Sequence, residues 1–103
     1  MKPKYKGCVY IIQFHGYWNT YKIGYTRNLK KRYKELNNSS VLYPPKILNA
    51  FYTNYPHMLE RAIHKRLADC RVNDNREFFK GKLVEIQKVC REEQHKINNK
   101  KIY

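Results

Sequence analysis

The stretch CVYIIQFHGYWNTYKIGYT, residues 8–26, decides the fold of this chain. Its first part, Cys8–Phe14, and its last part, Thr20–Thr26, are rich in β-branched and aromatic residues, which is typical of strands. Between them, His15–Asn19 contains two turn formers, Gly16 and Asn19. Two such runs joined by a short turn predict an antiparallel hairpin.

Periodicity predicts the remaining elements. After an N-cap at Asn28, a helix is expected over Leu29–Asn37. Lys46–Thr53 is typical of a third strand. A second helix is expected from Pro56 to about Asp69, and a third from Lys82 to about His95. The apolar residues that we expect to face the core are, helix by helix, Leu29, Tyr33 and Leu36; Leu59, Ile63 and Leu67; and Leu83, Ile86 and Val89 or Cys90.

The segment between the last two helices, Arg71–Lys80, is expected to be irregular, with a turn at Asn73–Asn75. The predicted order is therefore strand, strand, helix, strand, helix, helix. This order favours an α/β chain of the α+β kind, with a small, mainly antiparallel three-stranded sheet flanked by helices. Because no repeat or linker interrupts it, residues 1–103 are expected to form a single domain with a core over about 7–95.

Charge is the strongest global signal in the composition. The chain has 22 Lys and Arg against 8 Asp and Glu, a formal net charge of +14. Such a field attracts a polyanion, either nucleic acid or an anionic membrane, although a solubilising surface is the simpler alternative. No apolar run is long enough to cross a bilayer, and no basic stretch faces a clear row of Trp, Phe or Leu. We therefore expect DNA as the partner and no membrane.

The three cysteines, Cys8, Cys70 and Cys90, include no CxxC pair. This odd number predicts neither a disulfide framework nor a zinc site. We expect three small, buried or half-buried side chains in a reducing intracellular compartment, the cytoplasm or the nucleus.

Two pairs of residues are candidates for chemistry. Glu60 and His64 share one face of the second helix and border its apolar stripe. They could hold one hard metal ion through the carboxylate, with the imidazole as acid, base or phosphate donor, but the spacing alone favours an ordinary surface pair. Tyr10 and Lys22 lie mid-strand and can share the less apolar face of the hairpin. The alternative for Tyr10 and Lys22 is an ordinary amphipathic hairpin. The alternative for the basic run that contains Arg32 is a solvated basic face.

Together these segments resemble the GIY-YIG nuclease superfamily, in particular the branch found in phages and large DNA viruses. The match spans about residues 7 to 95. Its specificity comes from the order and spacing of the motifs taken together. The segments that carry it are Val9–Ile11, Tyr21–Gly24, Glu60 with Ile63–Leu67, and Glu77–Phe79.

The resemblance implies a DNA endonuclease or nickase, a phosphodiester hydrolase that depends on Mg²⁺ or Mn²⁺. It implies a catalytic role for Tyr10 in activating the nucleophile and for Arg32 in contacting the scissile phosphate. Glu60 corresponds to the metal ligand, Gly24 to the glycine that closes the second motif, and His64 to a histidine of the viral branch.

Two positions depart from the superfamily pattern. Cys8 stands where the first motif has glycine, and Lys22 stands where the second motif has tyrosine. The general base is therefore open: it is Tyr10, with a pKa lowered by Lys22, or a metal-bound hydroxide, or Lys22 itself if it is desolvated. The alternative function is a non-catalytic, basic nucleic-acid-binding module with the same fold. The side chains expected to bind the nucleic acid are Arg27, Lys30, Lys31 and Lys65.

Overall fold

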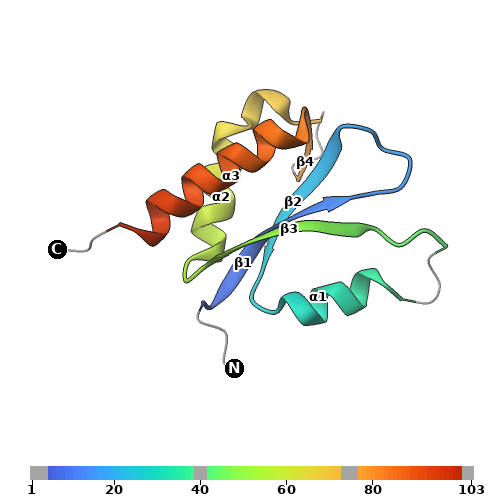
Figure 1. Cartoon of the computed structure of the whole chain (residues 1–103), viewed down its shortest axis with the longest axis horizontal. Coiled ribbons are helices and arrows are strands. Elements are labelled where there is room, and N and C mark those ends of the chain that lie inside the picture. The colour runs from blue at the N-terminus through green and yellow to red at the C-terminus, as the bar shows by residue number, and fades with distance from the viewer. Residues whose placement is uncertain (1–4, 39–41, 73–76, 101–103) are drawn as a thin grey trace.

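The computed structural model describes residues 5–38, 42–72 and 77–100. Its strands are β1 (Gly7–Gln13), β2 (Thr20–Thr26), β3 (Lys46–Thr53) and β4 (Phe78–Lys80). Its helices are α1 (Leu29–Leu36), α2 (Pro56–Arg66) and α3 (Leu83–Asn98), with a 3₁₀ turn η1 (Ala68–Cys70) after α2. The strands form one antiparallel sheet in the order β3-β1-β2-β4, with α2 and α3 on one side and α1 on the other (Figure 1).

The α+β class is confirmed, but the predicted three-stranded sheet is wrong. The described residues contain a fourth strand, so the order is β-β-α-β-α-β-α. β4 pairs with β2 through Thr20 opposite Lys80 and Tyr21 opposite Phe79. A strand of three residues has too little alternation to be recognised from its own sequence, and its place depends on this pairing and on the burial of Phe79. The predicted turn at Asn73–Asn75 lies outside the described residues.

The predicted hairpin is confirmed, and its two faces have different roles. Val9, Ile11 and Ile23 are completely buried in the core beneath α2 and α3. Tyr10 and Lys22 occupy the alternate positions, so they lie together on the opposite face, as predicted. The chain turns between the strands with left-handed backbone at Gly16 and Asn19, conformations that glycine and asparagine tolerate best.

The helix α2 buries its predicted stripe, because Leu59, Ile63 and Leu67 are each at most 6% exposed. It ends at Arg66, before the predicted end near Asp69. The hydrogen bond from Cys70 N to Leu67 O spans three residues, so the chain tightens there into the 3₁₀ turn. No helix among the described residues has the length and apolar character that crossing a membrane requires.

The helix α1 starts at the predicted cap, where the Asn28 side chain accepts a hydrogen bond from the backbone N–H of Lys31 at 3.0 Å. Its inner row differs from the prediction. Leu29, Arg32 and Leu36 are half-buried, whereas Tyr33 is 55% exposed. The reason is that Arg32 reaches under the helix to the phenol of Tyr10 (see below), which fixes the rotation of α1 and turns Tyr33 outward.

The three cysteines are free thiols, as predicted. Cys8 and Cys90 are buried and Cys70 is half-buried. Burial raises the pKa of Cys8 to about 11 and that of Cys90 to about 12. Both buried thiols therefore stay protonated at neutral pH and act as small apolar side chains.

Candidate functional site

All five side chains predicted as catalytic gather in one place, together with a sixth that the sequence analysis did not select. We call this group the polar cluster. Its members come from β1, β2, α1, α2 and the residue before β4, and they are Tyr10, Lys22, Arg32, Glu60, His64 and Glu77. Charges on Glu60 and Glu77 act on Tyr10, and charges on His64, Glu77 and Lys22 act on Glu60, which places the six within electrostatic reach of one another.

Tyr10 is the centre of the polar cluster. Its hydroxyl oxygen accepts a hydrogen bond from Arg32 Nε at 3.2 Å, and the guanidinium carbon lies 5.8 Å from the ring centroid. The ring lies across Gly24, its partner on β2. A Cβ atom at position 24 would be 2.7 Å from the hydroxyl oxygen, so this close approach requires glycine.

The pKa of Tyr10 is raised, mainly because burial disfavours the phenolate. Arg32 opposes this effect without overcoming it, and the charges of Glu77 and Glu60 reinforce it. The predicted lowering of this pKa is therefore wrong for the protein's own groups. At neutral pH Tyr10 is a neutral phenol that can donate its proton in a hydrogen bond.

Glu60 is a half-buried carboxyl group without a hydrogen bond or ion pair to any described residue. Its pKa is raised, first by burial and then by the charge of Glu77, while His64 partly offsets the shift. A bound cation would offset the cost of burying the ionised carboxylate of Glu60, because an opposite charge favours the ionised form.

His64 holds α2 against the sheet. Its Nε2 lies 2.8 Å from the backbone oxygen of Ile23, and since a carbonyl only accepts, Nε2 is the donor. The ring also packs against Phe79, with centroids 4.9 Å apart. Only Nδ1 is therefore left for the acid, base or phosphate-donor role that was predicted for this imidazole.

Glu77 is the member of the polar cluster that was missed. Its carboxylate forms an ion pair with Lys22, with 3.3 Å between Nζ and Oε2. The glutamate directly precedes Phe78, which pairs with Lys22 across β2 and β4. The signal was the Glu-Phe-Phe motif itself, but its meaning depends on β4, which the sequence analysis did not predict.

The donor chemistry of the polar cluster suits one kind of metal ion. Within residues 5–38, 42–72 and 77–100, no group of three or more His, Cys, Asp or Glu side chains could hold a metal. Closed zinc or calcium cages need such groups. Mg²⁺ keeps several waters and takes one or two carboxylates, so the unpaired Glu60 fits it.

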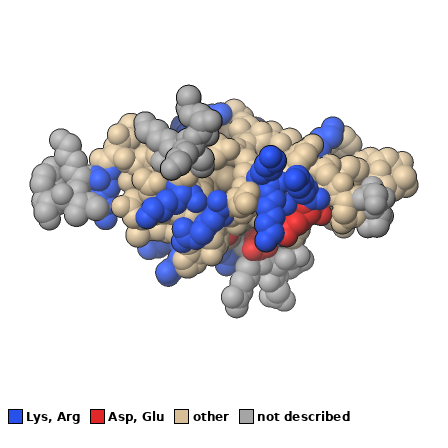
Figure 2. All heavy atoms as spheres, turned by 90° about the horizontal axis from the view of Figure 1, so that it is seen from below, with Lys and Arg blue, Asp and Glu red and all other residues tan. Residues whose placement is uncertain are grey.

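The side chains predicted to bind nucleic acid divide into two sets. Arg27, Lys30 and Lys31 lie at the start of α1, are exposed, and form no ion pair with described residues. Lys65 is also exposed, but it lies about 100° around α2 from His64 and thus away from the polar cluster. The face that carries α1 shows two groups of basic side chains, with acidic ones beside one group (Figure 2).

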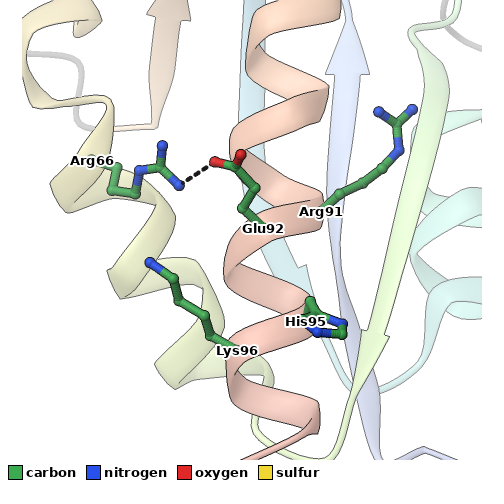
Figure 3. A pocket seen from close by; sticks show the side chains of 5 residues that line it. All are labelled: Arg66, Arg91, Glu92, His95 and Lys96. Atoms are coloured by element: carbon green, nitrogen blue, oxygen red, sulfur yellow. Dashed lines mark hydrogen bonds and ion pairs between the residues drawn. The ribbon is translucent and has the colours of Figure 1, made fainter.

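A hollow of about 530 Å³ between α2 and α3 has a different character (Figure 3). Arg66 Nη1 lies 2.8 Å from Glu92 and 3.0 Å from Glu93, which Lys96 also contacts at 3.3 Å. The hydrogen bond from Arg66 is the main cause of a lowered pKa at Glu92. Arg91 points away from these pairs (Figure 3). The group therefore ties two helices together, and we assign it no ligand.

Fold and site together define a small, basic α+β domain with a polar cluster on one face of its hairpin. This chain belongs to the T5orf172 domain family, whose model matches residues 7–94. The assignment to the GIY-YIG superfamily is therefore wrong, since the family that covers almost the whole chain is a different one.

Two viral proteins are similar to this chain. Protein 460R of Invertebrate iridescent virus 6, which is uncharacterized, is 36% identical over 86 residues, covering 81% of this chain and 38% of that protein. Protein 315L of the same virus, whose name gives it a KilA-N domain, is 37% identical over 90 residues, covering 81% of this chain and 37% of that protein. The chain thus spans less than two fifths of the length of these relatives. No solved structure matches it significantly.

Proposed function

We propose that this domain binds DNA through the face that carries α1. The observation that supports it most directly is the row of exposed cations Arg27, Lys30 and Lys31 beside the half-buried Arg32. Because the first three form no ion pair with described residues, their charges are available to phosphates. Membership of the T5orf172 family and the similarity to a viral protein named for a KilA-N domain agree with DNA binding.

The proposed binding depends on phosphates more than on bases. α1 has eight residues and spans about 12 Å, which is short for a recognition helix lying along a groove. Lysine and arginine contacts to the backbone fix position but carry no sequence information. We therefore expect double-stranded DNA to bind with little sequence preference and with a steep salt dependence.

Charge reversal tests which face binds. Fluorescence anisotropy with a labelled duplex, in EDTA and over a range of KCl, compares two double variants of equal net charge. Lys30→Glu with Lys31→Glu should weaken binding. It should also reduce the slope of log affinity against log salt by about 2, since each phosphate contact contributes about 0.9 to that slope. The control, Lys82→Glu with Lys88→Glu at α3, changes exposed cations away from α1 and should bind nearly as the wild type does. Equal effects of both variants, or affinity that ignores salt, would contradict the proposal.

A second candidate function is supported by the convergence of the polar cluster: we propose that it hydrolyses phosphodiester bonds with the help of Mg²⁺. Arg32 would bind the phosphoryl oxygens, and the neutral phenol of Tyr10 would donate a hydrogen bond to the phosphate or the attacking water. Glu60 would hold the ion, which supplies Lewis-acid stabilisation of the leaving 3′ oxygen when it is bound. The neutral phenol of Tyr10 keeps its proton and Lys22 is ion-paired with Glu77, so His64 Nδ1 is the candidate that these contacts leave for the general base.

Nicking of supercoiled plasmid with Mg²⁺, Mn²⁺ or EDTA tests this second candidate. Glu60→Gln should abolish metal-dependent nicking and leave DNA affinity in EDTA nearly unchanged. The matched control is Glu85→Gln, the same chemical change on the exposed surface of α3, which should cut as the wild type does. A wild-type protein that binds but never nicks would refute hydrolysis and leave DNA binding in place.

A further inference from the structure

A groove of about 1000 Å³ lies between the β1–β2 loop, the end of α1 and the start of β3. Its walls hold aromatic rings that are unusually open to solvent. Trp18 is 83% exposed, Tyr17 64%, Tyr43 59% and Tyr33 55%. Single exposed rings are common on protein surfaces, but four exposed rings around one hollow form the kind of patch that marks a binding site.

The groove already shows the contact geometry that flat ligands use. The rings of His15 and Tyr43 are stacked with centroids 4.2 Å apart and planes 11° from parallel. Tyr43 is followed by Pro44 and Pro45, which restrict the backbone and keep this wall stiff. A stiff wall of this kind reduces the conformational entropy lost when a flat group binds.

The charge of the groove selects the kind of flat group. Its lining includes the exposed Lys46 and the ring of His15, and among the described residues that line it none is Asp or Glu. Tyr33 also connects the groove to the α1 face, because it is flanked by Arg32 and Lys34. Gln13, on the groove wall, is three residues along β1 from Tyr10, a distance of about 10 Å.

We propose that this groove binds unpaired bases of a DNA strand by stacking them on its aromatic rings, while the phosphates of the same strand lie on the α1 face. The proposal rests on the proposed DNA binding and adds a substrate class, DNA with a single-stranded segment. Stacking on exposed rings beside a basic surface is how proteins bind single strands without reading sequence. The groove would thus guide a strand towards the polar cluster.

Trp18 makes the experiment direct, because it is the only tryptophan of the chain and lies in the groove wall. Its fluorescence is followed while the whole chain is titrated, in EDTA and low salt, with dT15, with an abasic 15-mer of equal charge, and with a duplex. We expect dT15 to quench Trp18 and to bind more tightly than the abasic strand by roughly five- to a hundredfold for each stacked base.

Two leucine variants separate the groove from the rest of the surface. Tyr43→Leu, which removes the stacked ring, should lose most of the advantage of dT15 over the abasic strand. Tyr52→Leu removes an exposed ring of β3 that is outside the groove and should keep it. Circular dichroism checks that both variants fold.

The outcomes distinguish the two proposals. If dT15 and the abasic strand bind equally and Trp18 is not quenched, stacking in the groove is wrong while DNA binding stands. If Tyr43→Leu and Tyr52→Leu behave alike, the bases stack elsewhere and the groove is the wrong place. If neither strand nor the duplex binds, DNA binding itself fails and the inference fails with it.

Discussion

Replacing Gly24 with alanine should destabilise the protein through one contact. The new Cβ would lie 2.7 Å from the hydroxyl oxygen of Tyr10, 2.9 Å from Cζ and 3.1 Å from Cε1. Since non-bonded atoms prefer about 3.5 Å or more, the ring has to move by roughly 0.8 Å. Tyr10 is 4% exposed and bonded to Arg32, so the movement is costly. Overpacking of this kind costs about 1–3 kcal/mol.

The assay is thermal unfolding with Gly81→Ala as the matched control. For a domain of this size each kcal/mol lowers Tm by about 4–8 °C, so Gly24→Ala should unfold roughly 5–20 °C below the wild type. At Gly81 the nearest atom to a new Cβ is 3.8 Å away, an ordinary contact, and alanine there should leave Tm unchanged or raise it slightly.

Tyr10→Phe shows whether the phenol is the cause. This substitution removes the oxygen nearest to the new Cβ, so Gly24→Ala should cost less in the Tyr10→Phe background than in the wild type. If Gly24→Ala keeps the wild-type Tm, or if the two substitutions simply add, the ring of Tyr10 is not confined by Gly24 and the described geometry of the polar cluster is refuted.

Three further substitutions have expected outcomes. Glu60→Gln should raise stability at neutral pH. Burial raises the folded pKa of Glu60 above its ordinary 4.5, so the free energy of unfolding of the wild type falls as pH rises from about 4.5 through the folded pKa. In urea unfolding between pH 4 and 8, the variant should lose this fall in the free energy of unfolding. Arg66→Met should lower Tm near pH 7, because it removes a partner of the buried Glu93. Arg66 also lowers the pKa of Glu92, and the stability that comes from this lowering is lost as the pH falls through the folded pKa of Glu92. The Tm values of variant and wild type should therefore converge in acid, and a Tm difference that persists there would contradict this. Asn28→Ala should cost about 0.5–2 kcal/mol and speed amide exchange in α1, and unchanged exchange would show that the cap is dispensable.

The parts of the fold that were predictable depend on local periodicity. Alternation in Cys8–Phe14 and Thr20–Thr26 was enough to place both strands of the hairpin and to put Tyr10 with Lys22 on one face. Spacing by four was enough for the buried stripe of α2. In each case the signal repeats several times within one element, so it survives single exceptions.

What was missed depends on contacts between distant segments. β4 is defined by its pairing with β2. The same pairing brings Glu77, the residue before β4, to Lys22. The inner row of α1 contains Arg32 in place of Tyr33, because a hydrogen bond to β1 outweighs the apolar character of tyrosine. The raised pKa of Tyr10 reflects burial by several elements, which spacing along the chain does not reveal.

The family assignment failed for a related reason. It rested on short motifs, two of them altered, at Cys8 and at Lys22. Short motifs identify which residues a hairpin places together, and here those residues do converge. The family, however, is defined over residues 7–94, and that whole span matches the T5orf172 domain.

The register of the hairpin couples the core to the polar cluster. Val9, Ile11 and Ile23 are completely buried, so the hydrophobic effect opposes a slip by one residue, which would turn every side chain to the other face. The same register sets Tyr10 beside Lys22. The polar cluster itself is unfavourable in part, because burial opposes ionisation of Glu60 and of Tyr10. The core therefore supports a group of side chains that stability alone does not require, which is the arrangement expected of a site kept for function.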